Sequence, residues 1–202
     1  MSQKRIDVSR IAKTAIFSAL SFVLYMYAKF PLPIFPFFLE LHFSQVPALI
    51  ASFLLGPLDA AIVIAVKILL KLPFSATVYV GEMSDLFIGL AFVVPPGIIY
   101  KRKRTLKGAL AGLVAGSALS ILMAVFFNIY VAIPFYVELF FGGDFDEIIS
   151  TCRPFAPGLN RENFKMLYSL YIALPFNLLR CAVTGIITFL LYKRISKIFS
   201  KF

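Results

Sequence analysis

The feature that most constrains this chain is a series of long apolar stretches separated by short polar segments. A hydrocarbon core about 30 Å thick needs roughly 20 helical residues to cross it, and most of the stretches approach that length. A soluble domain with 60% hydrophobic and 15% charged residues would expose large apolar patches. We therefore predict an all-α membrane protein, a six-transmembrane-helix bundle in which residues 1–202 form a single domain. The expected spans are residues 11–29, 43–55, 58–72, 80–100, 106–133 and 164–192.

The second and third stretches are short, and only Gly56 and Pro57 separate them. This dipeptide is a tight-turn signal, so the two stretches are predicted to form a helical hairpin. Long apolar runs also favour helices over a membrane barrel, whose strands would alternate apolar and polar residues.

Basic residues gather on one side of this predicted topology. Four precede the first span, five follow the fourth and four follow the sixth, which is 4 + 5 + 4 = 13 of the 20 Lys and Arg residues. Such loops face the cytoplasm, so both termini are predicted to be cytoplasmic in a multi-pass protein of the cell membrane. The net charge of +10 then reflects topology, and no nucleic-acid partner is expected. The residues are Lys4, Arg5, Arg10, Lys13, Lys101, Arg102, Lys103, Arg104, Lys107, Lys193, Arg194, Lys197 and Lys201.

The sequence has none of the motifs that would indicate an enzyme. It contains no G-x-x-x-x-G-K-[ST] phosphate loop and no Ser-His-Asp set. Its one histidine, His42, and its two cysteines, Cys152 and Cys181, lack metal-ligand spacing. We therefore predict no catalytic residues, no metal site and no cofactor.

Ionisable residues lie inside the third and fourth spans, where an unpaired charge is costly. Lys67 and Lys71 are four residues apart on one helix face, and Glu82 and Asp85 are three apart on the next span. They are predicted either to form an ion-pair cluster between neighbouring helices or to line a polar ligand pocket.

Two amides and a guanidinium are the other polar groups at membrane depth. Asn128 lies near the end of the fifth span, and Asn177 and Arg180 lie together on the sixth. They follow Pro175, which kinks or breaks a helix and frees a backbone carbonyl. In an apolar cavity these groups suit a flat polar heterocycle or a carboxylate. The alternative is that they are polar contacts between helices.

Small residues repeated every four positions predict close helix contacts. Gly108, Gly112 and Gly116 form such a row on the fifth span, where packing within the bundle is expected. Ala15 and Ala19 form a similar pair on the first span and are candidates for docking onto a separate membrane protein.

Several segments, in this order and spacing, resemble a known family. They are Pro31-Leu32-Pro33, Leu39-Glu40-Leu41-His42-Phe43-Ser44-Gln45-Val46-Pro47, Leu55-Gly56-Pro57-Leu58, Gly81-Glu82 and Leu174-Pro175-Phe176-Asn177-Leu178-Leu179-Arg180. With these segments the chain resembles the substrate-binding S-components of energy-coupling factor (ECF) vitamin transporters. Within that family it is most similar to the riboflavin-specific branch.

The resemblance implies a six-helix bundle with an outward-facing vitamin site and a lid formed by residues 30–42. It also implies partners: a transmembrane coupling protein, which Ala15 and Ala19 would contact, and two cytosolic ATPases that supply the energy. The expected function is thus uptake of riboflavin, or of FMN or a related flavin. The implied substrate-binding residues are Phe38, Leu41, Lys67, Glu82, Asn128, Asn177 and Arg180.

Two alternatives remain open at this point. The riboflavin branch has a lysine where this chain has Arg180, and a guanidinium binds carboxylates well, so pantothenate or another small vitamin is a second candidate. Glu82 and Asp85 are the features that favour an autonomous, ion-coupled secondary carrier.

Overall fold

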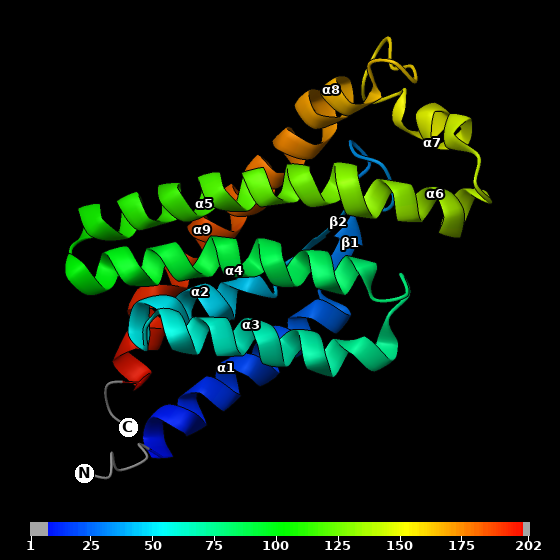
Figure 1. Cartoon of the computed structure of the whole chain (residues 1–202). Coiled ribbons are helices and arrows are strands. Elements are labelled where there is room, and N and C mark those ends of the chain that lie inside the picture. Colours follow the sequence, from blue (N-terminus) through cyan, green and yellow to red (C-terminus); the bar gives the residue numbers. More distant parts are fainter. Residues whose placement is uncertain (1–7, 200–202) are drawn as a thin grey trace, which may run out of the picture.

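The structure, a computed structural model, describes residues 8–199, and of residues 193–199 it describes only the backbone. Lys4, Arg5 and Lys201 of the predicted basic clusters lie outside the described residues. The chain is mostly helical, as predicted, with one small β-hairpin (Figure 1). In chain order the elements are α1 (Val8–Tyr27), β1 (Lys29–Pro31), β2 (Glu40–His42), α2 (Gln45–Leu54), α3 (Pro57–Lys71), η1 (Leu72–Phe74), α4 (Val80–Arg102), α5 (Leu106–Phe127), η2 (Asn128–Ala132), α6 (Ile133–Phe141), α7 (Phe145–Cys152), α8 (Phe164–Tyr168), η3 (Ser169–Ala173) and α9 (Leu174–Phe199).

Four helical stretches among the described residues are long and apolar enough to cross a membrane. They are Val8–Tyr27, Val80–Arg102, Leu106–Phe141 and Phe164–Tyr192. The third of them differs from the expected 106–133 span, because the helix continues through η2 into α6 and ends at Phe141. The expected hairpin of the second and third spans is present as α2 and α3, whose 10 and 15 residues are shorter than a full crossing.

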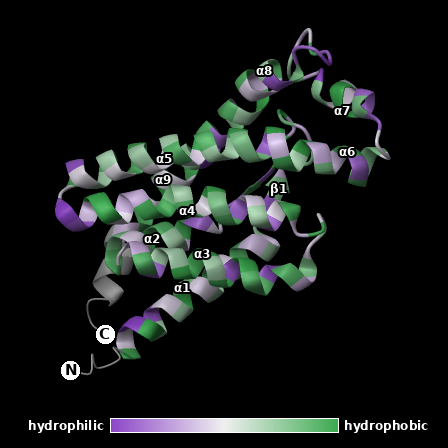
Figure 2. Ribbon diagram, in the orientation of Figure 1, coloured by the Kyte–Doolittle hydropathy of each residue, from purple (hydrophilic) through white to green (hydrophobic). Residues whose placement is uncertain are grey.

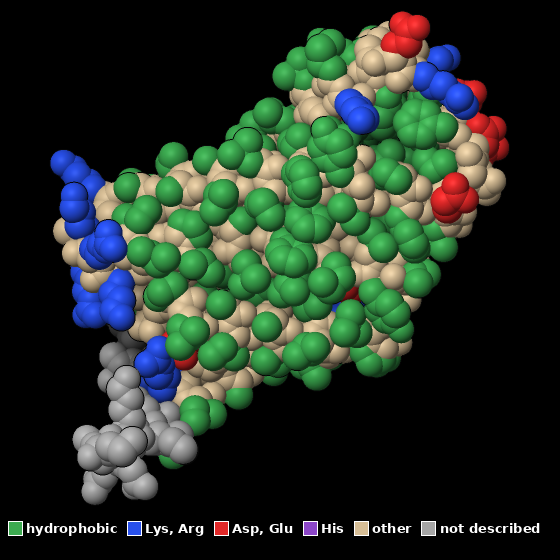
Figure 3. All heavy atoms as spheres, in the orientation of Figure 1, with side chains coloured by type: hydrophobic (Ala, Val, Ile, Leu, Met, Phe, Trp, Pro, Cys, Tyr) green, Lys and Arg blue, Asp and Glu red, His purple; other side chains and the backbone are tan. Residues whose placement is uncertain are grey.

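The surface has the pattern of a multi-pass membrane protein. Hydrophobic residues run along the length of the main helices (Figure 2), and residues such as Val114 and Leu190 are about 70% exposed. Exposed Lys and Arg residues cluster at one end, around the turn between α4 and α5 (Figure 3). We call this the basic end, and we call the opposite end, which carries β1, β2, α6 and α7, the distal end.

The part of the bundle near the basic end has a fully packed core, which we call the inner core. Its centre is α2, in which every residue from Gln45 to Ser52 is buried. Ten helical residues extend only about 15 Å, so α2 fills part of the bundle's length and leaves the distal part to other groups. The side chains with at most 2% exposure here include Ala48, Leu49, Ile50, Val63, Ile64, Phe92 and Val93.

The glycine row of α5 packs against α4, which confirms the prediction of an internal contact. A Cβ at Gly112 would lie 2.8 Å from the Cα of Pro96, and a Cβ at Gly116 would lie 2.9 Å from the Cδ of Pro96. Only glycine lets the two backbones approach this closely. The contact holds α4 and α5 side by side, so the distal ends of both helices face the cavity described below.

A second apolar cluster, the distal core, covers the other end of the bundle. It joins Phe35 and Leu39, from the segment between β1 and β2, to α6, α7, α8 and η3. Residues 134–163 separate the fifth and sixth expected spans, and they contain most of α6 and all of α7. α7 is amphipathic: Ile148, Ile149 and Cys152 are buried in the distal core while Glu147 is exposed. This segment is therefore ordered by burial of one helix face.

Candidate functional site

Two unusually wide helical turns lie beside the candidate site, and each comes just before a proline. In η2 the N–H of Ile133 bonds to the carbonyl of Asn128, and in η3 the N–H of Leu174 bonds to the carbonyl of Ser169. Both bonds reach back five residues. The following Pro134 or Pro175 lacks an N–H and crowds the carbonyl four residues earlier, so the turn widens. Wide turns of this kind occur often at functional sites.

The two turns share a sequence pattern that we did not predict. Residues 128–135 read NIYVAIPF, and residues 169–176 read SLYIALPF. The residue after the first copy is Tyr136 and the residue after the second is Asn177, and both side chains line the same cavity. A short local repeat thus builds two walls of the site.

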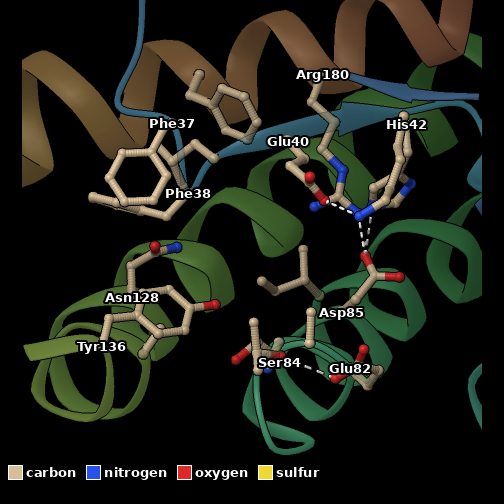
Figure 4. A pocket seen from close by; sticks show the side chains of 18 of the residues that line it. Phe37, Phe38, Glu40, His42, Glu82, Ser84, Asp85, Asn128, Tyr136 and Arg180 are labelled. Atoms are coloured by element: carbon tan, nitrogen blue, oxygen red, sulfur yellow. Dashed lines mark hydrogen bonds and ion pairs between the residues drawn. The ribbon is translucent and has the colours of Figure 1, made fainter. Parts of the chain in front are cut away.

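The cavity itself has a volume of about 250 Å³ and lies between the distal ends of the helices and the segment of residues 29–42. This volume is slightly below the roughly 300–1,000 Å³ typical of small-molecule sites. Figure 4 shows Arg180 and Asp85 pointing toward one another on one side, with Asn128 and Tyr136 on the other. The lining residues used below are Phe38, Glu40, His42, Glu82, Asp85, Asn128, Tyr136, Phe176, Asn177 and Arg180.

The amides of Asn128 and Asn177 are held by the helices that carry them. Each Nδ2 donates a hydrogen bond of 2.8 Å to the carbonyl four residues earlier, that of Ala124 or Ala173. Tyr168 donates to the Oδ1 of Asn128 at 3.1 Å. The Oδ1 of Asn177 has no hydrogen-bond partner among the described residues. The second amide therefore offers the cavity an acceptor in a fixed place.

Asp85 is the centre of a buried charged cluster that spans four elements besides its own. Its carboxylate accepts from the Nζ of Lys67 at 2.7 Å and from the guanidinium of Arg180. The Nε2 atoms of His42 and Gln45 lie 3.4 and 3.5 Å from it. The Nε of Arg180 is buried and has no partner among the described residues. Arg180 thus has one buried donor without a partner in the described part of the chain.

The other two ionisable side chains of the predicted cluster do not pair with one another. The carboxylate of Glu82 accepts from the hydroxyls of Ser75 and Thr77 at 2.7 and 3.1 Å. The Nζ of Lys71 donates to the carbonyl of Phe74 at 2.6 Å. Of the expected ion pairs between these two helices, the described residues form only that of Lys67 with Asp85.

The lid predicted at residues 30–42 is an antiparallel hairpin closed by β1 and β2. Its strands pair Lys29 with His42 and Pro31 with Glu40, and Lys29 also donates to the Glu40 carboxylate at 2.7 Å. Side chains alternate along a strand, so Glu40 and His42 face the cavity while Leu41, between them, does not line it. The ring of Phe38 lies 5.8 Å from that of Tyr136, across the cavity's edge.

His42 joins the hairpin to the charged cluster. Its Nδ1 lies 2.9 Å from the hydroxyl of Ser44, which in turn accepts from Lys67 at 2.7 Å. Burial lowers the pKa of His42 from 6.5 to about 4, and this effect outweighs the nearby Asp85, which raises it. At neutral pH the imidazole is therefore uncharged.

Five of the seven predicted substrate-binding residues line the cavity, and two do not. Phe38, Glu82, Asn128, Asn177 and Arg180 line it. Leu41 is buried on the other face of β2, and Lys67 is fully buried behind Asp85. The predicted docking residues Ala15 and Ala19 are both exposed on α1, on the side of that helix away from the bundle.

Sequence reasoning did not select three residues that shape the site. Asp85 was considered for an ion-pair cluster or a ligand pocket but was not among the named substrate-binding residues, His42 was not among them either, and Tyr136 was not singled out. The available signals were the intramembrane carboxylate, which is rare without a purpose, and the repeat that makes Tyr136 the counterpart of Asn177. The described residues contain no group of three or more His, Cys, Asp or Glu side chains that could hold a metal ion.

Comparisons with known proteins agree with this architecture. A family described as "ECF transporter, substrate-specific component" matches residues 9–192. The riboflavin transporter RibU of Staphylococcus aureus is 32% identical over 187 residues, 93% of this chain and 90% of that protein. The riboflavin transporter FmnP of Bacillus subtilis is 31% identical over 132 residues, 64% of this chain and 69% of that protein.

The fold has also been seen before. A solved structure of the S component of a bacterial ECF transporter superposes with a TM-score of 0.71 at 31% sequence identity. The match covers 94% of this chain and 96% of that one.

Proposed function

Because the chain belongs to the family of substrate-specific components of ECF transporters, we propose that it is the riboflavin-binding subunit of such a transporter in the plasma membrane. Its role is to capture the vitamin, or a related flavin such as FMN, for uptake. The observation that carries this proposal is the cavity in which Asn128, Asn177 and Arg180 face aromatic side chains beneath a hairpin lid. The names of the relatives RibU and FmnP point to the same ligand.

In the proposed complex the flavin ring lies among Phe38, Tyr136 and Phe176, and its polar edge meets Asn177 and Arg180. Burying the ring stabilises the complex by about 25 cal/mol per Å² of apolar surface, before the costs of association. The Oδ1 of Asn177 supplies an acceptor, and the guanidinium of Arg180, which lines the cavity, supplies a donor. A flavin's pyrimidine edge presents both donors and acceptors, so the two groups complement it.

The charges around the cavity support riboflavin over the two alternatives. Arg180 was the feature that favoured a carboxylate such as pantothenate, but its guanidinium already has Asp85 as counter-ion. Asp85 and Glu82 were the features that favoured an ion-coupled carrier. Both are engaged by neighbouring donors, Asp85 by two cations and Glu82 by two hydroxyls.

We further propose that the chain forms one domain with six membrane passes and both termini in the cytoplasm. The four long stretches supply four passes, and α2 and α3 supply two short ones. The basic end then faces the cytoplasm, as the positive-inside rule requires, and the cavity faces outward. The proposed partners are a coupling protein, which contacts α1 at Ala15 and Ala19, and two cytosolic ATPases.

A titration of the purified protein with riboflavin and with pantothenate tests the ligand. Saturable quenching of flavin fluorescence at submicromolar riboflavin, with no competition by pantothenate, is expected. Quenching that does not saturate, or displacement of the flavin by pantothenate, would remove riboflavin as the substrate. Uptake of riboflavin by this chain alone, in cells that lack a coupling protein and its ATPases, would instead support an autonomous carrier.

A further inference from the structure

The carboxylate of Asp85 stands where the charged cluster meets the cavity. It lies on α4, is 5% exposed and binds Lys67 of α3 on one side and Arg180 of α9 on the other. Lys67 is completely buried, donates to Asp85 and Ser44 and lies over the ring of Tyr25, and it does not itself line the cavity. Arg180 does line the cavity. The charge that a ligand meets at this end is therefore set by Arg180 and Asp85 together.

The cluster contains two cations and one anion, because His42 is neutral at pH 7. Asp85 lowers the net positive charge of this cluster from two to one, and the charge of Lys67 is fully buried behind it. With Asp85 in place, the positive charge of Arg180 is largely compensated, so its guanidinium suits a neutral carbonyl or imine acceptor. An anionic group at the same spot would lie close to the Asp85 carboxylate and be repelled. Without that carboxylate, two cations would favour an anion.

We propose that Asp85 is the specificity-determining residue that makes this end of the cavity select a neutral polar edge rather than an anion. The inference rests on the proposed function, since it takes the flavin's pyrimidine edge as the group beside Arg180. Asp85 acts partly through Arg180, which it holds in place, and partly through its own charge. It thus sets the ligand's charge, while the amides set the pattern of donors and acceptors.

The proton on the flavin ring provides the test. The pyrimidine ring of oxidised riboflavin carries an imide N–H whose loss changes the absorption spectrum, so the bound ligand reports the local charge. The purified protein is saturated with riboflavin, and the flavin spectrum is recorded between about pH 7 and pH 10. In Asp85→Asn the bound imide is expected to ionise at a pH lower than in the wild type by about one unit or more, a tenfold change or greater.

Two further variants make the result specific. Asp59→Asn removes another buried carboxylate, which pairs with Arg10 and accepts from Thr14 but does not line the cavity. In this control variant the bound flavin imide should lose its proton at the same pH as in the wild type. If Asp85→Asn fails to fold, Arg180→Gln keeps the carboxylate and removes the cation. Bound flavin should then ionise at a higher pH than in the wild type.

The outcomes separate this inference from the proposed function. Ionisation at the same pH in the wild type and in Asp85→Asn, or in Arg180→Gln where that variant is used, overturns the role of Asp85 and leaves riboflavin binding intact. A wild type that binds no riboflavin overturns the proposed function itself. Tyr25, Lys71, Glu82 and Tyr136 also face this region and are unchanged in these variants, so they do not contribute to the difference.

Discussion

Replacing Gly112 by alanine tests the close contact that places α4 and α5 side by side. The new Cβ would lie 2.8 Å from the Cα of Pro96 and 3.2 Å from its carbonyl oxygen, both of which are backbone atoms. Overpacking of this kind costs about 1–3 kcal/mol, and a backbone neighbour places it near the upper end. Alanine recovers about 1 kcal/mol of helix propensity. The net loss is about 2 kcal/mol, which lowers the melting temperature of a chain this long by about 4–8 °C.

The matched control is Gly185→Ala, on α9. Its Cβ would have Leu113 Cδ1 as nearest neighbour, at 3.8 Å, which is ordinary contact. The helix propensity is then gained without a clash, and the melting temperature should rise by about 2–4 °C. Thermal unfolding of the detergent-solubilised variants measures both. If Gly112→Ala melts at or above the wild-type temperature, the α4–α5 contact is not the constraint described here.

Three further predictions concern the site and its partners. Asn177→Leu should weaken riboflavin binding at least about tenfold in a fluorescence titration, because a buried polar edge of the ligand loses its partner. The control Ser150→Ala, on the exposed face of α7, should leave the affinity unchanged. Equal affinities of the two variants would contradict the assignment of Asn177. Because the pKa of His42 is lowered in the native state, the unfolded chain binds a proton there that the native state excludes. The free energy of unfolding therefore falls as the pH drops below about 6.5. At pH 5 the loss is roughly 2 kcal/mol. His42→Gln should lose less stability between pH 7.5 and pH 5 than the wild type, and equal losses would refute this. Ala15→Leu combined with Ala19→Leu should abolish copurification with the coupling protein and leave the riboflavin affinity unchanged; undiminished copurification would place the contact elsewhere.

The helical class and the position of most helices could be predicted from apolar length alone. So could the convergence of Asn128 with Asn177 and Arg180, because ionisable and amide groups at membrane depth must find one another or a ligand. The internal glycine row was equally predictable, since small residues at this spacing permit close backbones. These predictions depend on composition and periodicity, which tertiary packing does not override.

The parts that could not be predicted depend on contacts between distant segments. The wide turn at Asn128 follows from Pro134, but how it re-aims the amide toward Tyr168 depends on where α8 lies. For Lys67 the sequence left an ion pair and a place at the ligand both open, and the structure pairs it with Asp85. The resemblance implied Leu41 as a substrate-binding residue, and strand alternation places it on the opposite face of β2 from Glu40, away from the cavity lining.

The densely packed inner core has a consequence for how a bound vitamin could leave. Between the cavity and the basic end, α2, α3 and α4 present side chains such as Leu49, Ile64 and Phe92 that are wholly inaccessible. The cavity is therefore open toward the distal end and closed by the inner core toward the basic end. Delivery of the ligand to the opposite side of the membrane therefore requires either that the helices of the inner core separate or that the whole protein reorient so that the cavity opening reaches that side.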